Sequence, residues 1–255
     1  MTRAETFDDT IGALQQVLDD CVRRGDRTGY FAAMYGAVTR TVRERAAAGR
    51  FQDPVRMERF VARFAGRYLD AYDDWRADRP VSKSWRLAFE QAARWRPITL
   101  QHLLLGMNAH INLDLGVTAA TFAGPDGSGL EAVRDDFFAV NQVLSDLVDA
   151  CEAAVGTVSP WIGLADRVGG SGDETLIRFS LRMARRQAWN VAERIARLPE
   201  DERADATVVV DAEAVRVGRR VVRPGPWPTF VLLLVRLRER ARPDEIIRIL
   251  DAVRV

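Results

Sequence analysis

The segment at residues 99–122, TLQHLLLGMNAHINLDLGVTAATF, constrains the fold more than any other part of the chain. Pro97 breaks any preceding helix, and Thr99 is predicted to cap a new one. Placed at about 100° per residue, the Leu, Ile, Met and Ala residues occupy every side of that helix. A helix that is apolar on all sides is buried on all sides. We therefore expect other helices to surround it.

The rest of the sequence supplies those helices, because apolar residues recur at helical spacing between glycine or proline stops. Such patterns cover about 9–24, 29–48, 54–75, 82–95, 130–155 and 171–198, with closing helices at 230–240 and 244–253. At 207–222, β-branched residues alternate around Gly218, which predicts either a small β-hairpin or an irregular extended segment.

We therefore predict an all-α, single-domain helical bundle of about seven to nine helices that spans residues 1–255. Its core helices cover about 9–198, a linker with the alternating region covers 199–227, and the closing helices cover 228–255.

Charge and hydropathy exclude several classes of protein. The 37 Lys and Arg residues nearly balance the 36 Asp and Glu residues, which argues against a nucleic-acid partner. The longest apolar run, Phe230–Val235, is far shorter than the roughly 20 residues of a membrane span. The N-terminus lacks the apolar core of a signal peptide, and Cys21 and Cys151 are expected to be free thiols. We expect a soluble, cytoplasmic protein with no membrane partner, whose oligomeric state the composition does not fix.

The central segment carries six strongly polar residues, which include both histidines of the chain. On the wheel, His102, Gly106 and His110 share one side with Asp114 at its edge, whereas Asn108 and Asn112 share another. A buried amide or imidazole without a hydrogen bond costs roughly 1–3 kcal/mol. These groups therefore require partners, which are other side chains, waters, a metal or a substrate.

The functional interpretation is a small-molecule pocket beside this helix. His110 would be the general acid/base, Asp114 its orienting partner and His102 a second proton donor. Arg185 and Trp189, four residues apart, would form a cation–π pair or line an anion pocket. The predicted substrate-binding residues are Gln101, Asn108, Asn112, Gly106, Arg185, Trp189 and Tyr68.

This interpretation predicts an enzyme with non-redox acid/base chemistry, of the hydrolase, lyase or cyclase type, acting on a small organic substrate. The alternatives are a binding protein that uses the same pocket without chemistry, and a structural module in which the polar groups satisfy one another.

A metal-assisted version remains open. His110 and Asp114 at i, i+4 could share one ion with Asp70 of the third predicted helix, which would suit Mg, Mn or Zn. No organic cofactor is predicted, because the sequence has no P-loop, dinucleotide-binding, HExxH or CxxC pattern.

A Mg-dependent alternative rests on two acidic patterns. Asp73, Asp74 and Asp78 form DDxxxD, and Asn141, Ser145 and Asp149 form NxxxSxxxD. Together they resemble the metal-binding motifs of class I terpene synthases, which are all-α. However, the chain is short for that family, and its two motifs lie too close together in sequence.

The stretch QHLLLGMNAHINLDLG also resembles the central motif of an actinobacterial family of uncharacterised all-α proteins, defined as a domain of unknown function. WRLAF at 85–89 and RRQAW at 185–189 are similar to that family's flanking segments, so the likeness covers roughly Tyr68 to Ala196. The resemblance implies an all-α fold and a link to natural-product metabolism. It brings no established activity and no catalytic residues.

Overall fold

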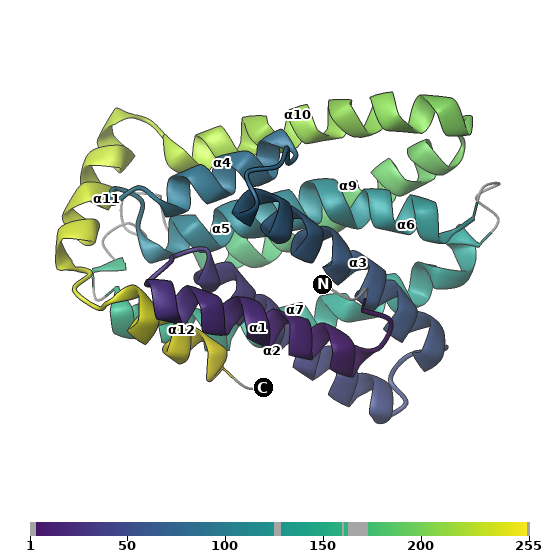
Figure 1. Cartoon of the computed structure of the whole chain (residues 1–255), viewed down its shortest axis with the longest axis horizontal. Helices are drawn as coiled ribbons and strands as arrows, with labels where there is room; N and C mark the ends of the chain where they lie inside the picture. The colour runs from purple at the N-terminus through teal and green to yellow at the C-terminus, as the bar shows by residue number, and fades with distance from the viewer. Residues whose placement is uncertain (1–3, 125–128, 160, 163–172, 254–255) are drawn as a thin grey trace.

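Helices form every regular element that the structure describes, as the sequence predicted (Figure 1). This computed structural model describes residues 4–124, 129–159, 161–162 and 173–253, and for 148, 149 and 173–180 it describes the backbone. The first part of the predicted helix at 171–198 therefore lies outside the described residues. None of the described helices combines the length and the apolar character needed to cross a membrane.

The predicted central helix is present, but it is interrupted by a different helical form. It consists of α5 (Thr99–Ala109), a π-helix η1 (His110–Leu115) and α6 (Gly116–Phe122). In a π-helix the hydrogen bonds join residues five apart, so one turn holds an extra residue. The sequence did not predict this change, which begins at His110.

The surrounding helices bury the central helix from several directions, as its apolar composition requires. In Figure 1 it runs through the middle of the molecule, with α10 above it and α1 and α2 below it. Its contacts are with α2 (Gly29–Ala47), α3 (Pro54–Arg76), α4 (Lys83–Ala92), α7 (Leu130–Val158), α9 (Asp173–Ala196) and α10 (Arg203–Val222).

Local signals explain where several helices begin and end. α1 (Phe7–Arg24) opens with a capping box between Thr6 and Asp9, and it stops at the left-handed Gly25. Asp53 caps α3, with Pro54 in its first turn. At the start of α5, the carboxylate of Glu239 accepts hydrogen bonds from the backbone N–H of Thr99. The prediction that the Thr99 side chain caps this helix is therefore wrong.

The prediction of a hairpin or an extended segment at 207–222 is wrong, because these residues belong to α10. Val210, Ala214 and Gly218, spaced at intervals of four, are buried on one side of that helix. The Asp211 carboxylate accepts hydrogen bonds from the backbone N–H groups of Lys83 and Ser84 at the start of α4. Packing against α4 and α5 therefore outweighs the β propensity of the valines. The predicted linker before it is also largely helical, as η2 (Glu200–Glu202) and the start of α10.

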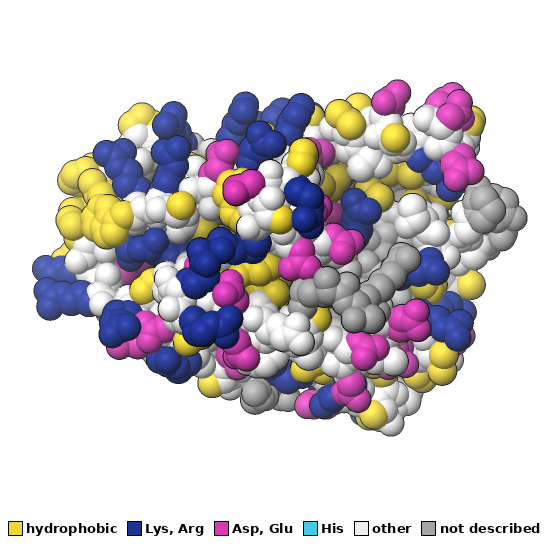
Figure 2. Space-filling view, in the orientation of Figure 1, with side chains coloured by type: hydrophobic (Ala, Val, Ile, Leu, Met, Phe, Trp, Pro, Cys, Tyr) yellow, Lys and Arg dark blue, Asp and Glu magenta, His cyan; other side chains and the backbone are white. Residues whose placement is uncertain are grey.

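The C-terminal helices α11 (Pro226–Arg238) and α12 (Pro243–Asp251) form one end of the molecule. Trp227 and Phe230 of α11 are exposed, and Figure 2 shows a group of hydrophobic side chains at that end beside several basic ones.

Candidate functional site

His110, the first residue of η1, lies among aromatic side chains and is 3% exposed. Its ring stacks on Phe64 of α3, with ring centroids 3.7 Å apart, and meets the edge of Tyr35 of α2 at 4.4 Å. Neither ring nitrogen has a hydrogen-bond partner among the described residues. Burial lowers the pKa of His110, and Asp114 only partly opposes this effect. The imidazole is therefore neutral at pH 7, with unused hydrogen-bonding capacity.

Asp114 lies beside His110, as the i, i+4 spacing predicted. Its Oδ2 is 3.5 Å from His110 Nδ1, at the outer limit of a hydrogen bond. Arg67 Nε donates to its Oδ1 at 2.9 Å, and Trp85 Nε1 donates to its Oδ2 at 2.8 Å. Side chains from α3 and α4 thus fix the carboxylate. Sequence reasoning missed Arg67 altogether and assigned Trp85 no role here, because only the tertiary packing brings them to Asp114.

A cavity of about 340 Å³ lies next to His110. Its described lining comes from α2, α3, α5, η1, α7, α9 and Ile162, and most of it is apolar. The residues of the lining that are not apolar are Tyr35, Thr39, His110, Cys151, Glu152 and Arg185. The polar segment therefore does border a pocket, but through His110 and not through its other polar residues.

The asparagine side of the helix forms a closed network directed at α10. Asn108 donates to the Ala214 carbonyl at 2.8 Å, and its own carbonyl oxygen accepts from Asn112 at 2.9 Å. Gln101 accepts from the Ile98 N–H and donates to the Val221 carbonyl. None of the three predicted substrate-binding amides lines the cavity. They hold helices together.

His102, Gly106 and Tyr68 are also absent from the cavity lining. His102 packs against the edge of Tyr30 at 5.7 Å, and burial, helped by nearby Arg27 and Arg236, lowers its pKa to about 3. A Cβ atom on Gly106 would lie 2.5 Å from Phe31 Cγ, so this glycine admits an aromatic side chain and not a ligand. Tyr68 is fully buried against Phe31.

The predicted pairing of Arg185 with Trp189 is wrong, although both side chains are buried. The Arg185 guanidinium lies over the ring of Phe137, 4.6 Å from its centroid. Trp189 packs against Phe137 and donates to Glu193, and it does not line the cavity. Only Arg185 of this predicted pair belongs to the site.

The predicted metal ligands do not form a group. Asp70 is exposed on α3, whereas His110 and Asp114 are buried. No set of three or more His, Cys, Asp or Glu residues in the described part of the chain is arranged to hold an ion. Both oxygens of Asp114 are already engaged by Arg67 and Trp85.

The two acidic patterns lie on different helices, α3 and α7. Asp73 and Asp74 lie near the C-terminal end of α3, whereas its N-terminal end contacts Asp136 of α7. Asp136, five residues before Asn141, therefore lies about 30 Å along α3 from Asp73. Asn141 accepts a hydrogen bond from Arg185, and the Asp149 side chain is outside the described ones.

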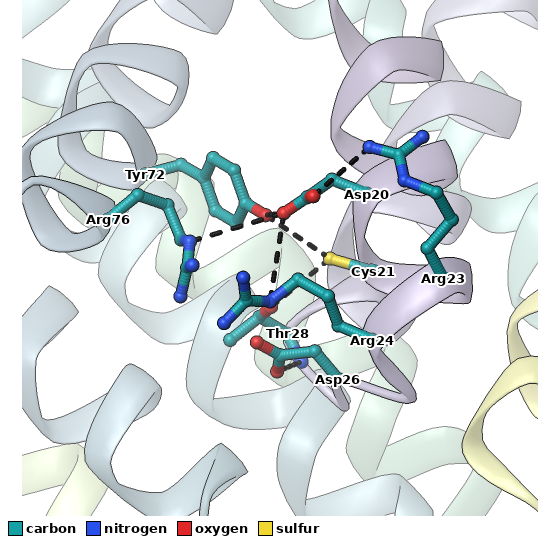
Figure 3. A network of polar contacts seen from close by, with 8 residues as sticks. All are labelled: Asp20, Cys21, Arg23, Arg24, Asp26, Thr28, Tyr72 and Arg76. Carbon is teal, nitrogen blue, oxygen red and sulfur yellow. Dashed lines mark hydrogen bonds and ion pairs between the residues drawn. The ribbon is translucent and has the colours of Figure 1, made fainter.

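A second polar cluster, centred on Asp20 and Cys21, joins α1 to α2 and α3 (Figure 3). The Cys21 sulfur lies 3.3 Å from Thr28 Oγ1 and 3.5 Å from the Tyr72 hydroxyl, which donates to Asp20. Burial raises the pKa of the free Cys21 thiol, so the thiol stays protonated. This closed cluster does not border the cavity.

Comparison with known proteins gives a family and no activity. The family model described as "Family of unknown function (DUF5995)" matches residues 7–224. No curated protein and no solved structure matches the chain.

Proposed function

We propose that this chain, which belongs to the DUF5995 family of unknown function, binds an elongated, largely apolar small molecule in the cavity beside His110. The cavity itself is the observation that carries the proposal. Its volume of about 340 Å³ falls in the range of small-molecule sites, and such sites combine an apolar wall with a few polar groups.

The wall favours an apolar ligand because its polar atoms are few. Burying apolar surface contributes roughly 25 cal/mol per Å², so affinity would come mainly from the ligand's hydrocarbon part. The neutral His110 ring would supply a hydrogen bond that no described side chain takes.

Nile red, an apolar dye whose fluorescence rises in an apolar site, tests this proposal. Leu144 of α7 lines the cavity and is only half-buried, so Leu144→Trp should fill the cavity without breaking the core. We expect a saturable signal with wild-type protein and at least about a tenfold weaker Kd for Leu144→Trp. The matched control, Val208→Trp on the exposed side of α10, should bind like wild type. Equal binding by both variants, or no binding by wild type, would reject the proposal.

A second candidate is the predicted acid/base enzyme with the same pocket. It is favoured by one observation, which is that a neutral imidazole beside a fixed carboxylate borders the cavity. Such a pair could activate water for attack on an ester or a similar group.

Hydrolysis of p-nitrophenyl dodecanoate tests the hydrolase form of this candidate. A positioned general base typically contributes at least about a hundredfold, so His110→Gln should lose that much activity while it still binds Nile red. If wild type and His110→Gln release nitrophenolate at the same rate, this form of the enzyme is excluded and binding without hydrolysis remains.

A further inference from the structure

The cavity is long, and its direction follows α7. Along that helix its lining runs from Val140 to Val155, a rise of about 22 Å. At the Val155 end the lining includes Ile162 and Leu100, both apolar. Leu100 belongs to that end because its neighbour Thr99 and Ser159 both hydrogen-bond to the Glu239 carboxylate. A ligand that fills this space is extended rather than compact.

Arg185 occupies the opposite end. Its Nε–H donates at 2.6 Å to Oδ1 of Asn141, the residue next to Val140, and a terminal nitrogen donates to the Phe137 carbonyl, one turn earlier on α7. The side chain is 4% exposed. All its partners are neutral, since no carboxylate of the described residues lies within ion-pair distance. A guanidinium has five N–H donors, so these two bonds leave donors for a ligand.

A buried cation with no carboxylate partner among the described residues is costly to the protein. Burial lowers the pKa of Arg185 to about 9, which still leaves the guanidinium protonated at pH 7. Buried charges are normally paired, and a guanidinium matches a carboxylate with two parallel hydrogen bonds. An anion bound in the cavity would therefore give the guanidinium the charged partner that the described residues do not supply.

Among the described lining residues, Arg185 is the positively charged group that could bind a ligand anion. His110 is neutral, and burial raises the pKa values of the Tyr35 phenol and the Cys151 thiol, the latter to about 11. Glu152 is the acidic residue of the described lining, and it lies eleven residues beyond Asn141, about 16 Å along α7. A second ligand carboxylate at the far end would lie among the apolar side chains Leu100 and Ile162, where its burial would be costly.

We propose that the ligand is an amphipathic monocarboxylate, with its carboxylate on Arg185 and its apolar chain extending along α7 toward Leu100 and Ile162. This inference rests on the proposed function and names the ligand class. It also predicts selectivity, because an alcohol of equal length lacks the charge and a dicarboxylate would bury a second charge at the apolar end formed by Leu100 and Ile162.

Displacement of Nile red by dodecanoate, dodecanol and dodecanedioate tests this assignment. For wild type we expect dodecanoate to bind about tenfold to a hundredfold more tightly than dodecanol, as for a charge-assisted hydrogen bond, and dodecanedioate to bind more weakly than dodecanoate. Arg185→Gln should remove the preference for dodecanoate over dodecanol. Arg182→Gln, an exposed position one turn earlier on α9, should keep it.

The outcomes separate the two proposals. If wild type does not bind Nile red, the proposed function fails. If it binds Nile red and dodecanol but has no preference for dodecanoate, the carboxylate assignment is overturned while the cavity remains a binding site. A preference that survives in Arg185→Gln also overturns the assignment. The wild-type comparison needs no variant, so the assignment remains testable even if Arg185→Gln does not fold.

Discussion

Both polar sides of the central helix carry buried polar groups, but Asn108 and His110 differ in their hydrogen bonding. On the side facing α10, Asn108 and Asn112 donate to oxygen acceptors within the chain. On the side facing α2 and α3, both nitrogens of His110 lack hydrogen-bond partners beside a cavity. A buried polar residue is therefore not in itself a sign of a ligand site. The sign is a polar group that the fold leaves unsatisfied next to space.

The largest loss of stability is expected from substitutions of Asp114, because this carboxylate joins the His110 side of the central helix to α3 and α4. Asp114→Ala would leave the Trp85 indole N–H without an acceptor and the partly buried Arg67 without its carboxylate. We expect a loss of about 3 kcal/mol in the free energy of unfolding, measured with urea. Asp114→Asn keeps an acceptor and should lose less. A loss below about 1 kcal/mol for Asp114→Ala would show that the carboxylate is not structural.

Asn108 gives the matching test on the closed side. Asn108→Leu leaves the Asn112 amide and the Ala214 carbonyl without their partner, so we expect a loss of about 1–3 kcal/mol in urea unfolding. Nile red affinity should not change, because Asn108 does not line the cavity. Weaker dye binding in a folded Asn108→Leu protein would contradict the division between the two sides.

The two histidines predict the direction of the pH dependence. The unfolded chain takes up a proton on His102 near pH 6.5, but the folded chain does so only near pH 3. The folded state therefore loses stability as the pH falls through this window, by about 1 kcal/mol between pH 6.5 and 5.5 for each such histidine. His102→Phe should show a correspondingly smaller loss in urea unfolding over this range. If its pH dependence equals that of wild type, His102 is not buried in the neutral form.

The smallest change in stability is expected at His110 itself. His110→Phe loses no hydrogen bond of ordinary length, and a phenyl ring can keep the stack on Phe64. We expect the free energy of unfolding to change by less than about 1 kcal/mol. A loss as large as that of Asn108→Leu would mean that His110 is as structural as the asparagines.

The sequence predicted the fold well where burial and periodicity agree. The all-round apolar composition of 99–122 required a surrounded helix, and the structure has one. At 207–222 the two signals disagree, because the valines favour strands whereas Val210, Ala214 and Gly218 recur at helical spacing. There the tertiary contacts with α4 and α5 decide the outcome.

The site was predictable only in part. The spacing of His110 and Asp114 predicted their proximity, but it could not show which polar groups would find partners. Asn108 pairs with a carbonyl of α10, whose helical state the sequence did not predict. Nothing in the composition of His110–Leu115 signals a π-helix, and the close approach of Phe31 at Gly106 is visible only in the packed structure.

The most direct test of the two-sided helix is a nitrogen-15 NMR titration of wild-type protein with Nile red or dodecanoate. The chain has only two histidines, so each imidazole can be followed separately, together with the Asn108 side-chain amide. At saturation we predict that the ring nitrogens of His110 shift, whereas those of His102 and the Asn108 amide remain where they were. A shift of the Asn108 amide or of His102 at saturating ligand, with His110 unchanged, would contradict the assignment of the ligand to the His110 side.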